Sequence, residues 1–510
     1  MEGTIAPPRI VLDNPAIARR HMHSVAFAQF QRDVGSHHHF QDFFLPIEGE
    51  PPRDSVFVEW LRGRPESVGE ALERLLPEKV KLALDIAGWG WVDALVRDDP
   101  ANPSEGWLAR AGAEVREDAQ ALEEMIAEAA QKQQFGYAAG LQRVREALVK
   151  RLLLNFLASR NVLPKYGFPV DVIELQLARS GDAGAAALEL SRDLSLAIGD
   201  YAPGTQTVAG KALWVSRGLV VRQGRAWPVY AWGQCVDCGA FRHGLQELPT
   251  ECPTCGATGI KPGAGKFAIP IWGFAGRRAK QVPGESRPPK RAMIGTFFGA
   301  YRGAEPDLAP VDGLPLKARF SHQGLITVIN RGPFGAGFRI CDRCGYSEPI
   351  TAGKRKGAKA HTHLMNDARE CKGTLQHLQL GHEYLTDVFE LRLERRMFED
   401  QARSVLYALL EACPALDIAR KDIDGTIHWA GRGEPAFVLF DNVPGGAGHT
   451  RRIGARLPEL MAAARDRVAN CECGEETSCY NCLRSYGNQL WHDSLSRGAA
   501  HAVLDDLVNA

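Results

Sequence analysis

The chain has 510 residues, of which 45% are hydrophobic and 24% charged, and its 61 basic residues balance its 61 acidic residues. This length predicts two to four domains, and the composition is that of an ordinary globular protein. Zero net charge excludes a global field that attracts nucleic acid, so such binding would need local basic patches. We find no signal-peptide core and no apolar run of the roughly 18 residues that a membrane span needs. We therefore expect a cytoplasmic protein with reduced cysteines.

The pattern of the first 200 residues predicts a mainly helical region. Asn14 and Pro15 mark a helix start, because proline suits the first helical position. Residues 45–105 predict loops and a helix or two. Over residues 106–161, apolar side chains repeat at three- and four-residue intervals, which predicts two helices separated at Gly136 and packed as an antiparallel pair. A strand is expected after Pro164.

Residues 201–275 alternate strand-like and turn residues and contain two cysteine pairs of CxxC spacing. The pairs are Cys235 with Cys238 and, further along, Cys252 with Cys255. Each pair is followed by a glycine, which permits the tight turn of a zinc knuckle. The segment predicts a zinc ribbon, in which the metal replaces a missing core in a small β module.

The next segment, 276–380, combines basic loops with a third metal candidate. Its ligands are Cys341, Cys344 and Cys371, with His363 as the preferred fourth ligand and His361 as the alternative. Two sets of basic residues in this segment are predicted to contact a phosphate backbone, against the simpler interpretation of solvated loops. They are Arg277, Arg278, Lys354, Arg355 and Lys356.

Residues 381–510 predict a strand, a long helix and a further strand, "AFVLF", that is apolar on both faces. An α/β domain follows from this pattern. Four cysteines then lie within twelve residues, at Cys471, Cys473, Cys479 and Cys482. Two disulfides would require an oxidising compartment, so we interpret the cluster as a tetrahedral Zn²⁺ site.

Catalytic motifs are weak. The segment Gly259–Ala268 lacks the spacing of a P-loop and has Phe267 where a magnesium-binding Ser or Thr should stand, so we expect no ATP hydrolysis by this chain. Asp387 and Asp441 lie on or after predicted strands and could hold Mg²⁺ in a nuclease. The alternative is that Asp441 caps the glycine-rich turn that follows it.

Several separated phrases carry a family resemblance: "LDNP…RRH" near the start, "FLASRNVLPKYGFPVDVIEL", "LFDNVPGGAGH" and "CLRSYGNQLWHDSLSR". Together they resemble the C-terminal zinc-binding region of MrfA/YprA-type superfamily 2 helicases. The same region forms a separate chain without motor lobes in the DrmB family of the DISARM phage-defence system. The resemblance implies a protein that begins where a motor would have ended, is not itself an enzyme, and works with a DrmA-like helicase ATPase on DNA.

Together these features predict a multidomain, mixed α/β protein that holds up to three Zn²⁺ ions. We expect a helicase-associated segment at 1–105, a helical region at 106–200, a β module at 201–275, basic loops with a knuckle at 276–380, and the α/β domain at 381–510. The expected function is that of a DNA-binding and helicase-binding accessory subunit in anti-phage defence. A Mg²⁺-dependent nuclease, the C-terminal part of a split DNA-repair helicase, and a scaffold without DNA contact remain the alternatives.

Overall fold

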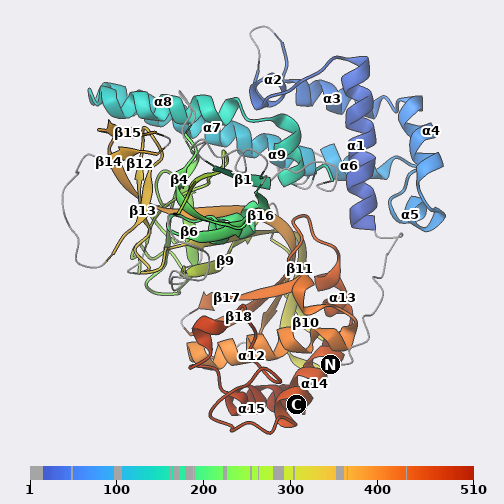
Figure 1. The fold of residues 1–510 in the computed structure, drawn as a ribbon. Coiled ribbons are helices and arrows are strands. Elements are labelled where there is room, and N and C mark those ends of the chain that lie inside the picture. The colour runs from blue at the N-terminus through green and yellow to red at the C-terminus, as the bar shows by residue number, and fades with distance from the viewer. Residues whose placement is uncertain are drawn as a thin grey trace.

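The computed structural model of this chain describes most of its residues. The described ranges are 15–46, 50–96, 106–160, 162–164, 172–177, 188, 190–221, 227–252, 255–261, 264–279, 292–302, 305–351, 361–364, 366–393, 395–431 and 433–509. Figure 1 shows a helical layer, a central region of sheets, and a C-terminal layer of helices on the opposite side. The multidomain, mixed α/β fold that the sequence predicts is confirmed.

The helical layer is built from the N-terminal third of the chain. Its helices are α1 (Pro15–Asp33), α2 (Phe40–Phe44), α3 (Arg53–Arg62), α4 (Glu66–Leu75), α5 (Glu78–Ala83), α6 (Gly90–Val96), α7 (Trp107–Gln131), α8 (Phe135–Val149) and α9 (Leu153–Ser159). Aromatic residues dominate its core, in which Phe30, Phe40 and Phe43 are fully buried. The Phe40 and Phe156 ring centroids lie 4.3 Å apart, so α2 is joined to α9 across more than a hundred residues of chain.

Two expectations for this layer need correction. The described residues between 45 and 105 contain four helices, α3 to α6, rather than a helix or two. Gly136 lies inside α8, and the turn between α7 and α8 falls at residues 132–134, where Gln133 has a positive φ of 56°. Apolar periodicity identified both long helices, but a glycine near a helix end is an unreliable marker of the turn itself.

Two sheets occupy the centre. The five-stranded sheet contains β1 (Val172–Leu177), β2 (Ser191–Asp193), β3 (Gln206–Ala209), β4 (Ala212–Leu219) and β8 (Phe274–Arg278). The larger sheet contains β5 (Val229–Gln234), β6 (Phe241–Leu245), β7 (Gly265–Ala268), β9 (Ile294–Tyr301), β10 (Ala309–Val311), β11 (Leu314–Asn330), β12 (Phe338–Cys341), β13 (Ser347–Pro349), β16 (Leu375–Arg392), β17 (Ile423–Gly431) and β18 (Glu434–Asp441). A separate hairpin joins β14 (His361–His363) to β15 (Asn366–Cys371).

The 18-residue strand β16 connects the parts of the molecule. It pairs antiparallel with β11, β12 and β18, and parallel with β7. One continuous sheet therefore draws strands from three of the predicted segments, whose boundaries stay predictions. The P-loop-like segment contributes β7, a strand antiparallel to β5, and does not lead directly into the helix that a P-loop requires.

The C-terminal layer covers β16, β17 and β18 with α12 (Glu399–Ala412), α13 (His449–Ala455), α14 (Leu457–Ala469) and α15 (Arg497–Val508). Strand β18 is buried along both faces from Pro435 onward, as its apolar run predicts. Helix α12 places Val405, Leu406 and Leu409 in the same core, each at most 1% exposed. The C-terminal zinc-binding segment follows α14 directly.

Candidate metal centres

The four C-terminal cysteines converge on one point. The Sγ atom of Cys471 lies 3.5 Å from those of Cys473 and Cys479, and the Sγ atom of Cys482 lies 3.7 Å from Cys473 and 3.8 Å from Cys479. A Zn–S distance of about 2.3 Å implies sulfur separations of about 3.8 Å across a regular tetrahedron. The four thiols therefore fit one Zn²⁺ ion and leave no open coordination position for chemistry.

The surroundings favour the thiolate form at Cys479, whereas burial raises the pKa of Cys473 and Cys482. The Cys479 Sγ accepts a hydrogen bond from the Asn481 backbone N–H at 3.4 Å, and the Cys482 Sγ accepts one from the Cys479 N–H at 3.2 Å. Burial raises the pKa of the Cys479 thiol, but the Asn481 N–H and the neighbouring thiols outweigh burial and lower this pKa to about 7. A lowered thiol pKa makes the proton easier to displace by a metal.

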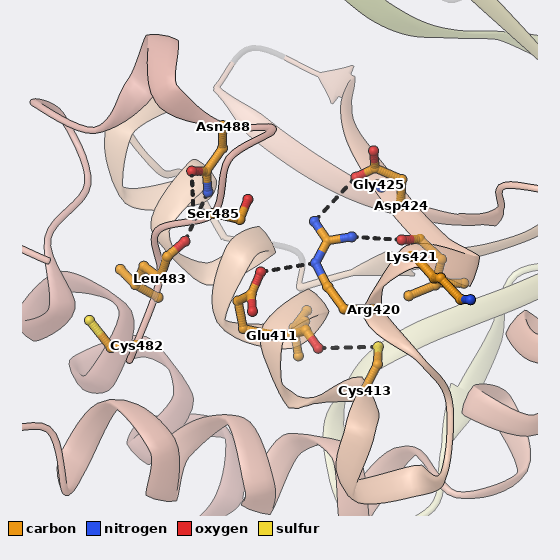
Figure 2. A network of polar contacts seen from close by, with 12 residues as sticks. Glu411, Cys413, Arg420, Lys421, Asp424, Gly425, Cys482, Leu483, Ser485 and Asn488 are labelled. Carbon is orange, nitrogen blue, oxygen red and sulfur yellow. Dashed lines mark hydrogen bonds and ion pairs between the residues drawn. The ribbon is translucent and has the colours of Figure 1, made fainter. Parts of the chain in front are cut away.

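Side chains outside the cluster hold its loops in place. Arg497 donates from Nε to the Cys473 carbonyl at 3.0 Å, and from Nη1 to the Val468 carbonyl at 2.9 Å. Figure 2 shows Asn488 accepting from the Ser485 N–H and donating to the Leu483 carbonyl, both at 2.8 Å, directly after Cys482. The zinc module is thus continuous with the C-terminal layer of helices and not a free appendage.

Figure 2 also shows polar contacts that join α12 to the segment leading into β17. Arg420 reaches Glu411 on α12 at 2.9 Å, the Ile423 carbonyl at 2.7 Å, and Asp424 at 3.6 Å (Figure 2). Cys413 is fully buried and donates to the Leu409 carbonyl at 3.4 Å, so it belongs to none of the clusters.

The ribbon cysteines form a second cluster. Cys235 Sγ lies 3.6 Å from Cys255 Sγ, and Cys238 Sγ lies 3.6 Å from Cys252 Sγ. The ligand atoms of all four cysteines lie within 4.8 Å of one another. This arrangement also fits one tetrahedral Zn²⁺ ion.

Two similar turns build the ribbon. Gly239 donates to the Cys235 carbonyl at 3.0 Å and has φ +76°, and Gly256 donates to the Cys252 carbonyl at 2.8 Å with φ +72°. Positive φ values explain why a glycine follows each cysteine pair. The first turn also packs on β17, because a Cβ added to Gly239 would lie 3.0 Å from the Trp429 ring.

The third cluster joins β12 to the β14–β15 hairpin. Cys341 Sγ lies 3.8 Å from Cys371 Sγ, and Cys344 Sγ lies 3.3 Å from His361 Nε2. These four ligand atoms also lie within 4.8 Å of one another. Burial lowers the pKa of His361 and so favours the neutral imidazole that binds zinc.

His361, and not the preferred His363, is the histidine of this cluster. His361 stands directly opposite Cys371 in the hairpin, and residues opposite one another in an antiparallel pair project to the same face. The register shifts between Thr362 and His363, which instead stands opposite Asn366 near the turn. Both histidines had acceptable spacing, so only the strand register could distinguish them.

The predicted phosphate contacts have different environments. Arg277 donates from Nε to the Leu364 carbonyl at 2.9 Å and from Nη2 to the His363 carbonyl at 3.0 Å, so its guanidinium braces the hairpin of the third cluster. Arg278 is exposed at the end of β8. Contacts of either arginine with phosphate stay predictions. Three further predicted contacts lie outside the described residues: Lys354, Arg355 and Lys356.

Asp387 and Asp441 are fully buried and close together at the glycine-rich turn. Asp441 accepts hydrogen bonds from the backbone N–H groups of Ala447, His449 and Thr450, at 2.7, 3.0 and 2.9 Å. Burial raises the pKa of Asp441, and the charge of Asp387 raises it further. Asp441 thus holds the turn and caps α13, the simpler of the two sequence interpretations.

Asp387 also has structural partners. Its Oδ1 lies 2.8 Å from His322 Nδ1, and its Oδ2 accepts from the Gly448 N–H at 3.1 Å. Among the described residues, the potential metal-ligand groups are the three cysteine clusters, and neither aspartate belongs to one. The geometry therefore offers no specific support for a magnesium nuclease. Sequence reasoning missed His322, because a β-bulge brings it to Asp387.

No helix in the described part of the chain is both long and apolar enough to cross a membrane.

Comparisons with known proteins find a curated relative and several solved structures. Over almost its whole length, 98%, the chain is 23% identical to Druantia protein DruE from Escherichia coli strain UMEA 4076-1, but it spans only 30% of that relative. It also resembles a crystal structure of the DUF1998 helicase MrfA bound to DNA, with a TM-score of 0.34 and 12% identity; the match covers 66% of this chain and 33% of that one. A second structure, of MrfA bound to DNA and AMPPNP, matches with a TM-score of 0.31 and 11% identity, and the match covers 67% of this chain and 33% of that one.

A family model covers the C-terminal cluster itself. Residues 405–483, from α12 to just beyond Cys482, match the model described as the MrfA Zn-binding domain. Its four cysteines are those whose sulfur atoms converge. The predicted zinc cofactor is confirmed, with three clusters of four ligands that fit Zn²⁺.

Proposed function

We propose that this chain is a zinc-stabilised, helicase-associated subunit that binds DNA and a helicase ATPase in an anti-phage system. The observation that carries the proposal is the match of residues 405–483 to the MrfA Zn-binding domain, together with a four-thiol cluster of zinc geometry. The similarity to DruE, a phage-defence protein, supports the biological setting. A DISARM-like role beside a DrmA-like partner rests on the sequence resemblance alone.

The zinc ions have a structural role in this proposal. Each cluster is complete with four protein ligands, whereas a catalytic zinc keeps one position for water or substrate. The clusters fix the ribbon, the hairpin and the C-terminal loops relative to the large sheet. The chain then presents a rigid surface to DNA and partner, and ATP hydrolysis is the partner's.

The experiment is an affinity purification of the tagged chain from its own host after nuclease treatment, read by mass spectrometry. We expect a superfamily 2 ATPase at near-stoichiometric yield, because the proposed subunit would act through a stably bound helicase partner. A Cys479→Ser chain serves as the matched control, since losing the C-terminal zinc should weaken that recovery. Recovery of no ATPase with the intact chain would contradict the partner proposal.

DNA binding is tested separately, with the purified chain and a fluorescent single-stranded oligonucleotide. Charge reversal at Lys354, Arg355 and Lys356 should weaken binding and reduce its salt dependence, because each lost phosphate contact removes counterion release. Unchanged binding would favour a scaffold that makes no DNA contact through these three residues.

A further inference from the structure

A polar cluster outside the zinc centres surrounds Asp387 at the junction of the helical layer with the C-terminal part. It gathers Arg19 and Arg20 from α1, His322 from β11, Asp387 from β16 and Arg451 from α13. The junction is direct, because Arg20 donates from Nη2 to the Gly446 carbonyl at 3.0 Å. Figure 1 shows one end of α1 facing the region of α13.

A β-bulge aims His322 into this cluster. Ser321 pairs with Val388 and Gly324 with Thr386, so two residues of β11 oppose the single residue Asp387. Bulges of this kind redirect a side chain and are over-represented next to functional sites. The bulge depends on Gly324, because a Cβ there would lie 2.2 Å from the Val388 side chain.

The glycine-rich turn closes over the buried carboxylate. A Cβ on Gly446 would lie 2.1 Å from the Asp387 carboxyl carbon, so only glycine permits this approach. The two oxygens of Asp387 are occupied by His322 Nδ1 and the Gly448 N–H. Asp387 therefore orients the His322 ring, whose side chain is 28% exposed, and leaves Nε2 on the opposite side of that ring.

Three arginines share the single buried carboxylate Asp387 in this cluster. Burial lowers the pKa of Arg19, Asp387 opposes this effect, and the charges of Arg20 and Arg451 lower the pKa further. In the part of the chain that the structure describes, the guanidinium groups of Arg19 and Arg451 make no salt bridge within 4.0 Å. Arg19 lies over the Trp107 ring, 5.7 Å from its centroid. Mutually repelling cations that are held together by the fold favour an anionic ligand.

Two buried polar atoms beside the same turn also lack hydrogen-bond partners among the described residues. His449 Nδ1 and Thr450 Oγ1 are buried in the first turn of α13 and have no hydrogen-bond partner among the described residues. Thr450 is fully buried. Buried polar atoms normally find partners, so these two atoms leave hydrogen-bonding capacity unused at the start of α13.

We propose that Arg19, His322 and Arg451 form a binding site for one phosphate group, with Asp387 as the positioning residue that holds His322. If the phosphate belongs to DNA, this proposal rests on the DNA-binding function proposed above. A free phosphate or a nucleotide has the same chemistry, and the experiment distinguishes these sources.

The test uses the full chain and two probes: a fluorescent oligothymidylate and inorganic pyrophosphate. The variants are Arg19→Gln, Arg451→Gln and His322→Gln, with Arg74→Gln as a control that removes one exposed charge from α4, outside the cluster. Because charge-assisted hydrogen bonds are strong, each site variant should weaken oligonucleotide binding roughly tenfold, whereas the control should not. The slope of log affinity against log salt should also fall by about 0.7 per lost contact.

Zinc content and melting temperature confirm that each variant is folded, and Arg451→Gln is the safest because Arg451 is exposed. If all three site variants bind the oligonucleotide as well as the intact chain does, the proposed site is wrong, but the proposed DNA function stands. A third outcome is that the intact chain binds pyrophosphate saturably but does not bind the oligonucleotide, and that the site variants abolish pyrophosphate binding. This outcome would support a free-phosphate site and contradict the DNA function. Binding of neither probe would overturn both.

Discussion

The ribbon cluster and the β14–β15 cluster hold four ligands each, yet they are built in different ways. In the ribbon, both halves are cysteine turns closed by glycines of positive φ, Gly239 and Gly256. In the other cluster, only Cys341 and Cys344 belong to such a turn, and a hairpin supplies His361 and Cys371. A local turn specifies its ligands by spacing, whereas a hairpin specifies them by register.

The largest expected effect comes from removing a ribbon cysteine. Cys252→Ser, at a position 3% exposed, should reduce zinc from three to two ions per chain and lower the melting temperature strongly. Structural zinc contributes about 10 kcal/mol or more to the folding of small zinc modules. Metal analysis and calorimetry check this. Cys413→Ser, a buried cysteine outside the clusters, is the control and should keep all three ions.

The second prediction addresses the corrected ligand. His361→Ala should lose the zinc of the hairpin cluster, and His363→Ala should keep it, because His361 Nε2 faces Cys344 and His363 lies beyond the register shift. Zinc content after dialysis against a chelator measures the difference. Loss of zinc in His363→Ala alone would restore the spacing-based assignment.

The third prediction compares glycines at equivalent positions of the two clusters. Gly256→Ala should cost about 1–2 kcal/mol of unfolding free energy, because its φ is +72° but, among the described residues other than its chain neighbours, no atom lies within 4 Å of the added Cβ. Gly345→Ala should cost clearly more, since φ is +76° and the added Cβ would lie 1.8 Å from the Leu219 carbonyl oxygen. Denaturant unfolding of both variants gives the comparison, and equal losses would contradict it.

The smallest expected effect concerns the support of His361. Its ring stacks on Tyr346, with centroids 5.0 Å apart and planes at 23°. Tyr346→Leu should destabilise the hairpin cluster by about 1 kcal/mol and accelerate chelator-driven zinc release from it. The rate from the ribbon cluster of the same protein is the internal control. Equal acceleration at both clusters would indicate a general loosening of the fold.

Much of the zinc chemistry was predictable from the sequence, because cysteine pairs at CxxC spacing specify their own turns. The short C-x-C-x5-C-x2-C segment likewise brings its four thiols together locally. The choice between His361 and His363 was not predictable, since it depends on which residue faces Cys371 across the hairpin. Turn positions such as the one near Gly136 were equally difficult, because periodicity locates a helix better than its ends.

The sequence by itself determined the helical N-terminal part, the buried strand at 434–441 and eleven of the twelve metal ligands, because helical periodicity, apolar runs and clustered cysteines are visible along the chain. Only the tertiary structure decided how Arg19, His322, Asp387 and Arg451 meet. These residues come from four elements, and their meeting depends on a one-residue bulge in β11 and on glycines that let the 441–450 turn approach Asp387. Such long-range contacts are set by the packing of the whole sheet, which no local pattern encodes.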